Sequence, residues 1–149
     1  GQQYGEESLV LTYYNTPSVV ELVPDCCPLA GGLISLHIKN VLPELKVLLT
    51  GHCYEEAQYC ETVSVDVTTE IATIQIPPAT THGISDLEVS VDGGREWTPS
   101  TLSLALYGPL SPSLLLPVAH REGGSTMVLK EENLFSASKH TVTVGGKPV

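Results

Sequence analysis

The sequence predicts an all-β protein of short strands, because apolar and polar residues alternate along most of the chain and no helical periodicity interrupts them. The clearest run lies at residues 87–92, where Leu87, Val89 and Val91 alternate with polar side chains. Each such run ends near glycine, proline or aspartate, as the strands of a β-sandwich do. No window of ten or more residues has the spacing of an amphipathic helix. We therefore expect a β-sandwich.

The expected strands follow one another along the chain, each with an apolar residue at every second position. In order, they lie at residues 9–14, 35–39, 63–68, 87–92, 102–106 and 142–144. Residues 43–49 and 130–135 have room for one or two helical turns at most, so they do not change the predicted fold class.

A tight turn is expected where the strand at residues 87–92 ends. Asp92, Gly93 and Gly94 stand there, and a polar segment then leads to Trp97. Asp-Gly is a pair that the type I′ hairpin turn favours, because both central residues of that turn have positive φ. We therefore assign Asp92, Gly93 and Gly94 to a structural turn between two strands.

The composition is that of a folded, acidic protein. Of 149 residues, 42% are hydrophobic and 16% are charged, which is too apolar for a disordered chain. Seven basic residues against 17 acidic ones give a formal net charge of −10, which argues against a nucleic-acid-binding surface. Unbroken apolar runs are only a few residues long, so no membrane insertion of this segment is expected.

The chain has four cysteines, Cys26, Cys27, Cys53 and Cys60. An even number permits two disulfides, but a domain of this size can build a core without them. The cysteine spacing is not that of a typical zinc site, and the sequence has no Asn-x-Ser/Thr glycosylation motif. The missing glycosylation motif tips the expected compartment towards the inside of the cell.

Candidate catalytic and metal-binding residues are few. His82, Ser85 and Asp86 lie close together in the sequence, but a catalytic triad brings its members together from different elements around an oxyanion hole. We expect these three residues to belong to a turn. A site that combines His52 with two of the cysteines lacks the usual ligand spacing. The sequence therefore predicts no catalytic residue, no metal and no cofactor.

The second half of the chain resembles the first at a spacing of about 93 residues. Turn and strand markers recur in the same order, which favours a repeat over chance similarity between β segments. The chain is interpreted as about one and a half copies of one unit. Aligned pairs, at this spacing or within one residue of it, are Leu9 with Leu102, Leu11 with Leu104, Tyr14 with Tyr107, and Gly31-Gly32 with Gly123-Gly124.

The markers within one unit have a recognisable order. An aromatic strand end is followed by an alternation of prolines and apolar residues, then by a glycine pair and another strand. These markers are Tyr13-Tyr14, Pro17, Val20, Leu22, Pro24 and Gly31-Gly32 in the first copy, with Gly123-Gly124 and Asn133 in the second. In this order they resemble the IPT/TIG domain, the immunoglobulin-like module of plexins, related receptors, some transcription factors and large protist proteins. The glycine that usually follows the next strand is replaced by Asn40, which tolerates positive φ.

The resemblance implies an immunoglobulin-like β-sandwich of the IPT/TIG type in three parts. Residues 1–16 are the C-terminal strands of a preceding repeat, 17–108 a complete repeat, and 109–149 the N-terminal part of a following one. We expect the strands of the incomplete following repeat to be unpaired unless the rest of the parent chain or a partner completes the sheet. Receptor members of the family carry a cysteine where Cys53 lies. Cys60 is its candidate disulfide partner, and two free, partly buried thiols are the alternative.

The same resemblance implies a non-enzymatic structural and protein-interaction segment of a large tandem repeat protein. It would act as a spacer or scaffold in a cytoskeletal or ciliary assembly, with other proteins and neighbouring repeats as partners. The alternative is an extracellular receptor or adhesion ectodomain. A transcription-factor domain is disfavoured by the negative charge. A carbohydrate-binding accessory module would use Trp97, which we expect instead to close a hairpin against the core or the next unit.

Overall fold

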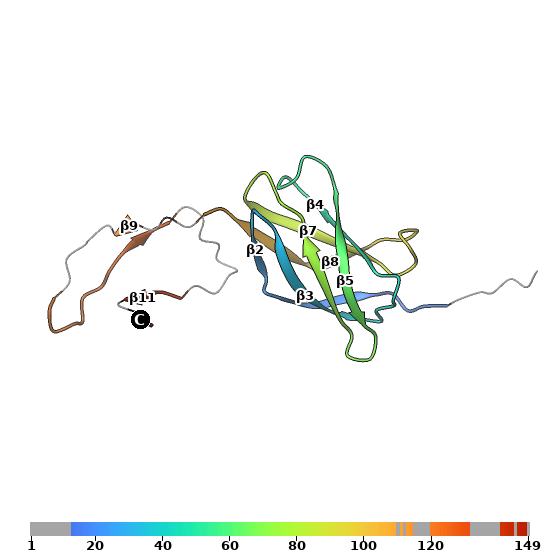
Figure 1. Ribbon diagram of the computed structural model, residues 1–149, viewed down its shortest axis with the longest axis horizontal. Helices are drawn as coiled ribbons and strands as arrows, with labels where there is room; N and C mark the ends of the chain where they lie inside the picture. Colours follow the sequence, from blue (N-terminus) through green and yellow to red (C-terminus); the bar gives the residue numbers. More distant parts are fainter. Residues whose placement is uncertain are drawn as a thin grey trace, which may run out of the picture.

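The computed structural model describes residues 13–109, 111, 113–114, 120–131, 141–144 and 146–148. This described part is all-β and contains no helix, so the predicted fold class is confirmed at that level (Figure 1). No helix long and apolar enough to cross a membrane is therefore found among these residues. Eight strands form the main sheet: β1 (Ser18–Val23), β2 (Cys26–Pro28), β3 (Gly32–Lys39), β4 (Lys46–Thr50), β5 (Gln58–Asp66), β6 (Ile71–Ile76), β7 (Gly83–Ser90) and β8 (Thr98–Tyr107).

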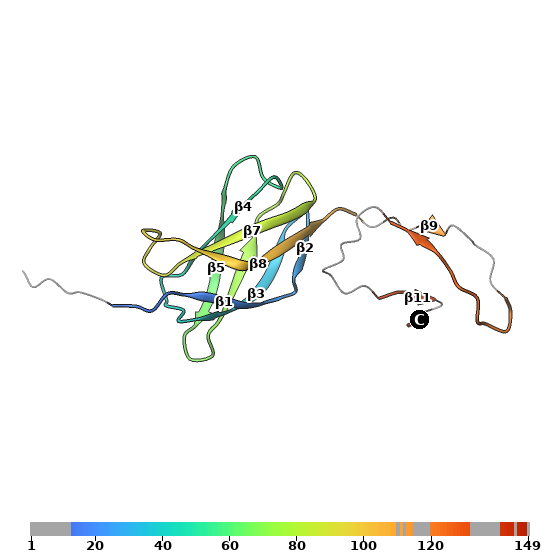
Figure 2. The same ribbon diagram turned by 180° about the vertical axis from the view of Figure 1, so that it is seen from behind.

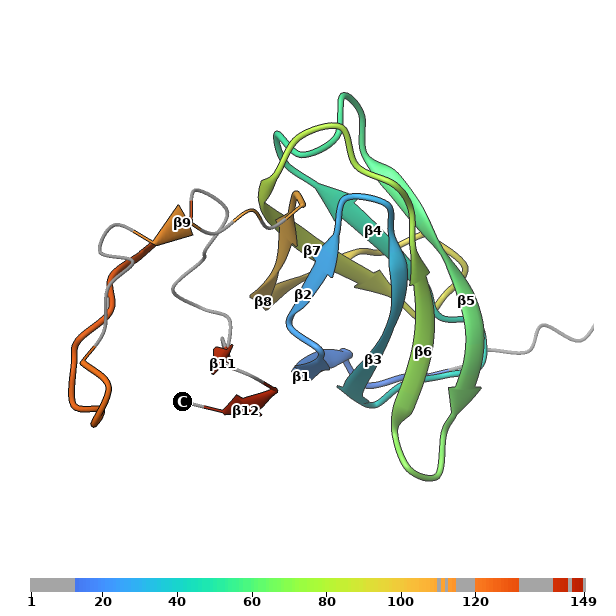
Figure 3. The same ribbon diagram turned by 60° about the vertical axis from the view of Figure 1, so that its left-hand side comes forward.

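The main sheet nearly closes into a barrel. Its strand order is β1-β3-β6-β5-β4-β7-β8-β2, and neighbours are antiparallel except for β2 and β8, which are parallel. The two ends of the sheet approach each other, because β1 contacts β8 and β2 contacts β3 (Figure 3). The predicted sandwich is therefore not clearly separated into two layers, and one curved sheet surrounds the core.

Alternating apolar side chains supply that core. In β7, Leu87 and Val89 are buried, and Val91 just beyond the strand is buried as well, as the sequence pattern predicted. The inward positions of the neighbouring strands are filled in the same way, mainly by leucine and isoleucine. The fully buried side chains of β3, β4, β6 and β8 include Leu36, Ile38, Val47, Leu49, Ile74, Ile76, Leu104 and Leu106.

β5 departs from the predicted alternation. The sequence pattern indicated that Val63, Val65 and Val67 share a buried face, yet Val63 is 55% exposed and Val67 is 45% exposed. The register between β5 and β6 shifts between Thr62 and Ser64. Val63 is the extra residue of this bulge, between Thr62 and Ser64. Val67 lies beyond the end of the strand, whereas Val65 packs against the core. This part of the prediction was wrong, and it leaves two valines on the surface.

The segment at residues 43–49, which had room for one or two helical turns at most, contains no helix and belongs mostly to a strand. β4 begins at Lys46 and pairs with β5 on one side and β7 on the other. Val47 and Leu49 are fully buried at alternate positions, so pairing and burial override a weak local preference for helix. In the second segment, Lys130 belongs to a strand, and residues 132–140 lie outside the described part of the chain.

All strands of the main sheet lie within residues 17–108, the segment that the sequence predicts to be a complete repeat. Residues 1–12 of the predicted preceding repeat lie outside the described residues, as do 9–12 of the first predicted strand. After the sheet, the described residues contain four short strands in two separate pairs, so for these strands the expectation that they are unpaired was wrong. These pairs are β9 (Ser113–Leu114) with β10 (Leu129–Lys130), and β11 (Thr143–Val144) with β12 (Lys147–Pro148).

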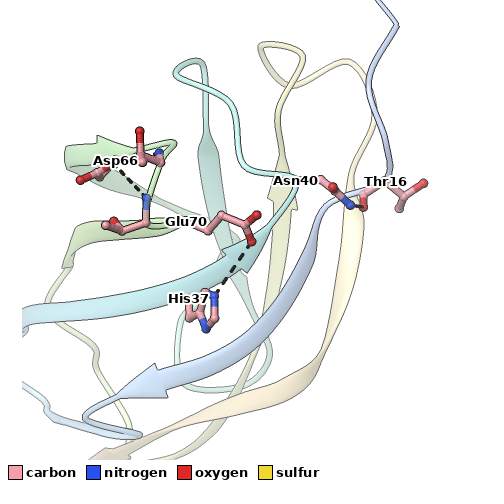
Figure 4. Close-up of polar contacts among 7 residues, drawn as sticks. Thr16, His37, Asn40, Asp66 and Glu70 are labelled. Carbon is pink, nitrogen blue, oxygen red and sulfur yellow. Dashed lines mark hydrogen bonds and ion pairs between the residues drawn. The ribbon is translucent and has the colours of Figure 1, made fainter.

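Among the described residues, two other than glycine adopt positive φ, and polar contacts hold both regions (Figure 4). Asn40 has φ of 61°, as its place in the glycine position suggested, and its side-chain amide donates to the carbonyl of Thr16 at 3.0 Å. Glu70 has φ of 60° in the β5–β6 hairpin, and its carboxylate lies 4.0 Å from Nε2 of His37. Asp66 opens that hairpin by accepting the backbone N–H groups of the two threonines that follow Val67.

Candidate functional site

The predicted turn residues lie in the connection between β7 and β8, but the turn is not of type I′. The connection runs over residues 91–97, so it is longer than the two-residue loop of a tight hairpin. Positive φ occurs at Gly93 and Gly94, with values of 79° and 94°, and not at Asp92. The Asp92 side chain instead bonds to backbone N–H groups further along, which holds a wider loop.

The Asp92 carboxylate collects most of the hydrogen bonds of this loop. It accepts the Ser90 hydroxyl at 2.7 Å and the backbone N–H groups of Arg95 and Glu96, each at 3.0 Å. It also accepts the Tyr14 hydroxyl at 2.7 Å. The N–H of Glu96, then the Ser90 and Tyr14 hydroxyls, lower the pKa of Asp92. The loop is thus arranged around an ionised carboxylate.

Tyr14 connects the segment before β1 to this loop. Its hydroxyl also lies 3.2 Å from a carboxylate oxygen of Glu96. The hydrogen bond to Asp92 is the main cause that raises the pKa of Tyr14 to about 12. The sequence singled out Tyr14 only as a strand end. Nothing local to it indicates a partner 78 residues away, so this contact could not be predicted from periodicity.

An aromatic pair lies on the surface beside the same loop. The rings of Trp97 and Tyr59 are 5.9 Å apart between centroids and inclined at 50°, a tilted arrangement that aromatic side chains favour. Tyr59 is 66% exposed, and Trp97 is half-buried. We expected Trp97 to pack on the core or on a neighbouring unit, whereas its ring packs on Tyr59 of β5.

An open hollow of about 410 Å³ lies next to this aromatic pair. It is found where β4 and β5 diverge, because β5 pairs with β4 only through Gln58–Cys60. The Thr62 hydroxyl donates to the carbonyl of Leu45 at 3.1 Å across the point of divergence. We call this space the β4–β5 hollow. Its lining residues are Leu45, Lys46, Tyr59, Cys60 and Thr62.

The four cysteines are free thiols in the structure. Cys27, Cys53 and Cys60 are buried in the core. Burial raises the pKa of Cys27 to about 11 and that of Cys60 to about 12, and the charge of Cys27 adds to the shift at Cys60. Burial, and then the charges of these three thiols, also raise the pKa of Tyr54. The Cys53–Cys60 disulfide stays a prediction.

We expect one cysteine to react quickly in the native reduced protein and three to react slowly. Cys26 is half-buried, whereas the other three are buried and all have pKa values raised by burial, which leaves little thiolate at pH 8. Mass spectrometry after timed alkylation with iodoacetamide measures this. Rapid labelling of Cys27 or Cys60 in the folded protein would contradict the burial described above.

The residues that could suggest a catalytic triad do not form one in the structure. Ser85 and Asp86 lie in β7 rather than in the expected turn, and adjacent strand residues point to opposite faces of the sheet. The Ser85 hydroxyl is fully buried and donates to the carbonyl of Thr50 at 2.8 Å. Asp86 accepts the Ser103 hydroxyl on the exposed side. Among the described residues, no group of histidine, cysteine and acidic side chains is arranged to hold a metal ion.

The arrangement offers contact surface rather than a set of converging reactive groups. Its parts are an aromatic pair, a partly apolar hollow and a loop fixed by a hydrogen-bond network around one carboxylate. No protein-family model and no curated protein matches this chain. The class that the described residues define is therefore an all-β domain with a candidate interaction surface.

Proposed function

We propose that the chain is a non-enzymatic structural and protein-interaction segment of a tandem repeat protein with immunoglobulin-like domains of the IPT/TIG type. The strand order supports this interpretation. β1 and β2 follow each other in the chain but stand at opposite ends of the sheet order. This is expected if the first strand of a sandwich crosses from one layer to the other.

The division of β5 supports the same proposal. Its first residues, Gln58–Cys60, pair with β4, and its later residues, from Glu61 to Asp66, pair with β6. If β5 is shared in this way, the curved sheet can be read as two layers, β1-β3-β6-β5 and β5-β4-β7-β8-β2. Two such layers around one core would make an immunoglobulin-like sandwich.

The observation that carries the functional proposal is where the chain enters and leaves the barrel. β1 begins at one end and β8 ends at the opposite end (Figures 1 and 2). The entering segment is fastened to the β7–β8 loop by the Tyr14–Asp92 hydrogen bond. Units with such ends join in a line, and a fixed entry segment stiffens the joint. We infer a spacer or scaffold in a cytoskeletal or ciliary assembly.

The redox state of the cysteines can show whether the protein works inside or outside the cell. An intracellular scaffold keeps its thiols reduced, whereas an extracellular receptor or adhesion ectodomain forms disulfides. Counting free thiols in the denatured protein, alkylated at lysis of its natural source, separates the two. Four free thiols support the intracellular scaffold. Two or none favour the extracellular alternative.

We expect two units joined head to tail to be elongated in solution. The test protein links two copies of residues 13–109 directly, since the buried core lies between Val19 and Leu106 and each copy contains all of it. Small-angle X-ray scattering should give a radius of gyration well above about 16 Å, the value expected if both copies together formed one compact globule. Tyr14→Phe in the second copy should broaden the distribution of distances by loosening the joint. A compact particle in both cases would contradict an array of end-to-end units.

A further inference from the structure

We propose that the free edge of β5, beside the β4–β5 hollow, binds an extended basic segment of a partner protein as an additional strand. This inference rests on the proposed function as an interaction module, and it names the surface and the kind of partner. Binding by strand addition uses backbone hydrogen bonds for affinity and pockets for alternate side chains for specificity. The described residues supply both features at one place.

The free edge arises from the way β5 changes partners. β5 pairs with β6 from Glu61 to Asp66, but with β4 only through Gln58–Cys60. Along the described part of the chain, no strand therefore pairs with the β4-facing side of β5 beyond Cys60. Unpaired backbone N–H and C=O groups at a sheet edge form a template for another strand. The exposed side chain of Val63 adds apolar surface at this edge.

The hollow gives that added strand a side-chain pocket. Cys60 is buried and Thr62 is half-buried on β5, and both line the hollow together with Leu45. Glu61, which lies between them, is exposed, and so is Tyr59 just before Cys60, although Tyr59 also contributes to the lining of the hollow. A strand laid along β5 would follow the same alternation. Its alternate side chains would enter the hollow, and the others would lie beside the exposed face of β5.

Charge decides which occupant fits. Glu61 and Asp66 lie on the exposed positions of β5, and Glu44 immediately precedes Leu45 of the hollow, whereas Lys46 is the basic residue among those lining it. A partner with apolar residues towards the hollow and basic residues on the other face complements this pattern. A second copy of this chain is disfavoured, because two chains of net charge −10 repel each other.

The experiment titrates the isotope-labelled 149-residue chain with the peptide Ac-Lys-Val-Lys-Val-Lys-Val-Lys-NH2 and follows amide shifts by NMR. Seven residues span about 20 Å as a strand, enough to cover the free edge. We expect saturable shifts centred on Glu61–Asp66, with further shifts at Tyr59 and at the Trp97 indole N–H. The same peptide with glutamate in place of lysine should bind at least tenfold more weakly. A version N-methylated at alternate residues should also lose most of its affinity, because it cannot complete the ladder.

Two protein variants locate the site. Val63→Lys puts a like charge at the free edge and should weaken binding of the lysine peptide at least fivefold. Leu33→Lys is the matched control, since Leu33 is also an exposed aliphatic residue, 58% exposed, but lies on β3. We expect it to leave the affinity within about twofold. The thermal midpoints of both variants check that the fold is retained.

Three results would overturn the proposal. The first is that no lysine peptide, with valine, isoleucine or phenylalanine at the alternate positions, causes saturable shifts at β5. The second is that the glutamate peptide binds as tightly as the lysine peptide. The third is that Val63→Lys and Leu33→Lys weaken binding of the lysine peptide equally. The last result would mean that the peptide is held by net charge alone. None of these results bears on the proposed end-to-end array. If the two-unit protein is elongated but no peptide binds at β5, the spacer function is supported and only this binding site is rejected.

Discussion

Replacing Gly31 with alanine should lower the free energy of unfolding by about 3 kcal/mol, from the cost of a left-handed conformation plus that of overpacking. Gly31 has φ of 85°, in the region that disfavours residues with a Cβ. A Cβ there would overlap the backbone carbonyl oxygen of Ile76 and lie 3.3 Å from backbone atoms of Pro77 and Pro78. Backbone atoms of a paired strand cannot move aside cheaply, so both penalties apply.

The neighbouring glycine provides a matched control for this prediction. A Cβ at Gly32 would lie 3.5 Å from Sγ of Cys27, an ordinary contact, and Gly32 does not have positive φ. Gly32→Ala should therefore change stability by less than about 1 kcal/mol. Urea unfolding followed by Trp97 fluorescence measures both variants. Equal losses for Gly31→Ala and Gly32→Ala would refute the close approach of Gly31 to Ile76.

Gly123 can be compared with Gly31, because the two glycines are aligned in the predicted repeat. Gly123 also has positive φ, but among the described residues no atom other than those of its chain neighbours lies within 4 Å of the position that a Cβ would take. Within the described residues, packing and backbone conformation both constrain Gly31, whereas backbone conformation alone constrains Gly123. Sequence comparison identifies that a glycine belongs there, whereas the reason differs between the two places and depends on what the fold brings close.

Alternation predicted the parts of the fold in which one face of a strand is buried along its whole length. Leu87 and Val89 are examples, because β7 lies between two partners and its inward positions meet the core throughout. The same rule failed at Val63, where a bulge changes the phase of β5. It also missed β4, a strand of five residues that is fixed by pairing on both sides rather than by its own preference. Periodicity carries no information about bulges or changes of partner.

The candidate site was only partly predictable. Asp92, Gly93 and Gly94 were identified as a turn because their residue types have strong local preferences. The hollow, the Tyr59–Trp97 pair and the Tyr14 contact were not identified, because each joins residues that are distant in the sequence. An aspartate that precedes a glycine pair is read as a turn residue. That its carboxylate also holds the segment before β1 follows only from the folded arrangement.

Replacing Asp92 with alanine should be the most damaging change in the β7–β8 loop, with a fall in the thermal midpoint of about 10 °C at pH 7. The substitution leaves the Ser90 and Tyr14 hydroxyls and the N–H groups of Arg95 and Glu96 without their shared acceptor. Asp86→Ala is the control, since Asp86 accepts the Ser103 hydroxyl at the surface. It should lower the midpoint by no more than about 2 °C.

The effect of Asp92→Ala should also depend on pH, in a direction that its pKa fixes. The pKa of Asp92 is lowered in the folded protein from an ordinary value of 3.8, so folding favours the ionised form. The stability that this carboxylate contributes is therefore fully present above about pH 4 and is lost as the pH falls towards the lowered folded-state pKa. Thermal midpoints of the wild-type and Asp92→Ala proteins, measured from pH 7 to pH 2, should converge as the pH decreases. A constant difference down to pH 2 would mean that the loop depends on the shape of the side chain and not on its charge.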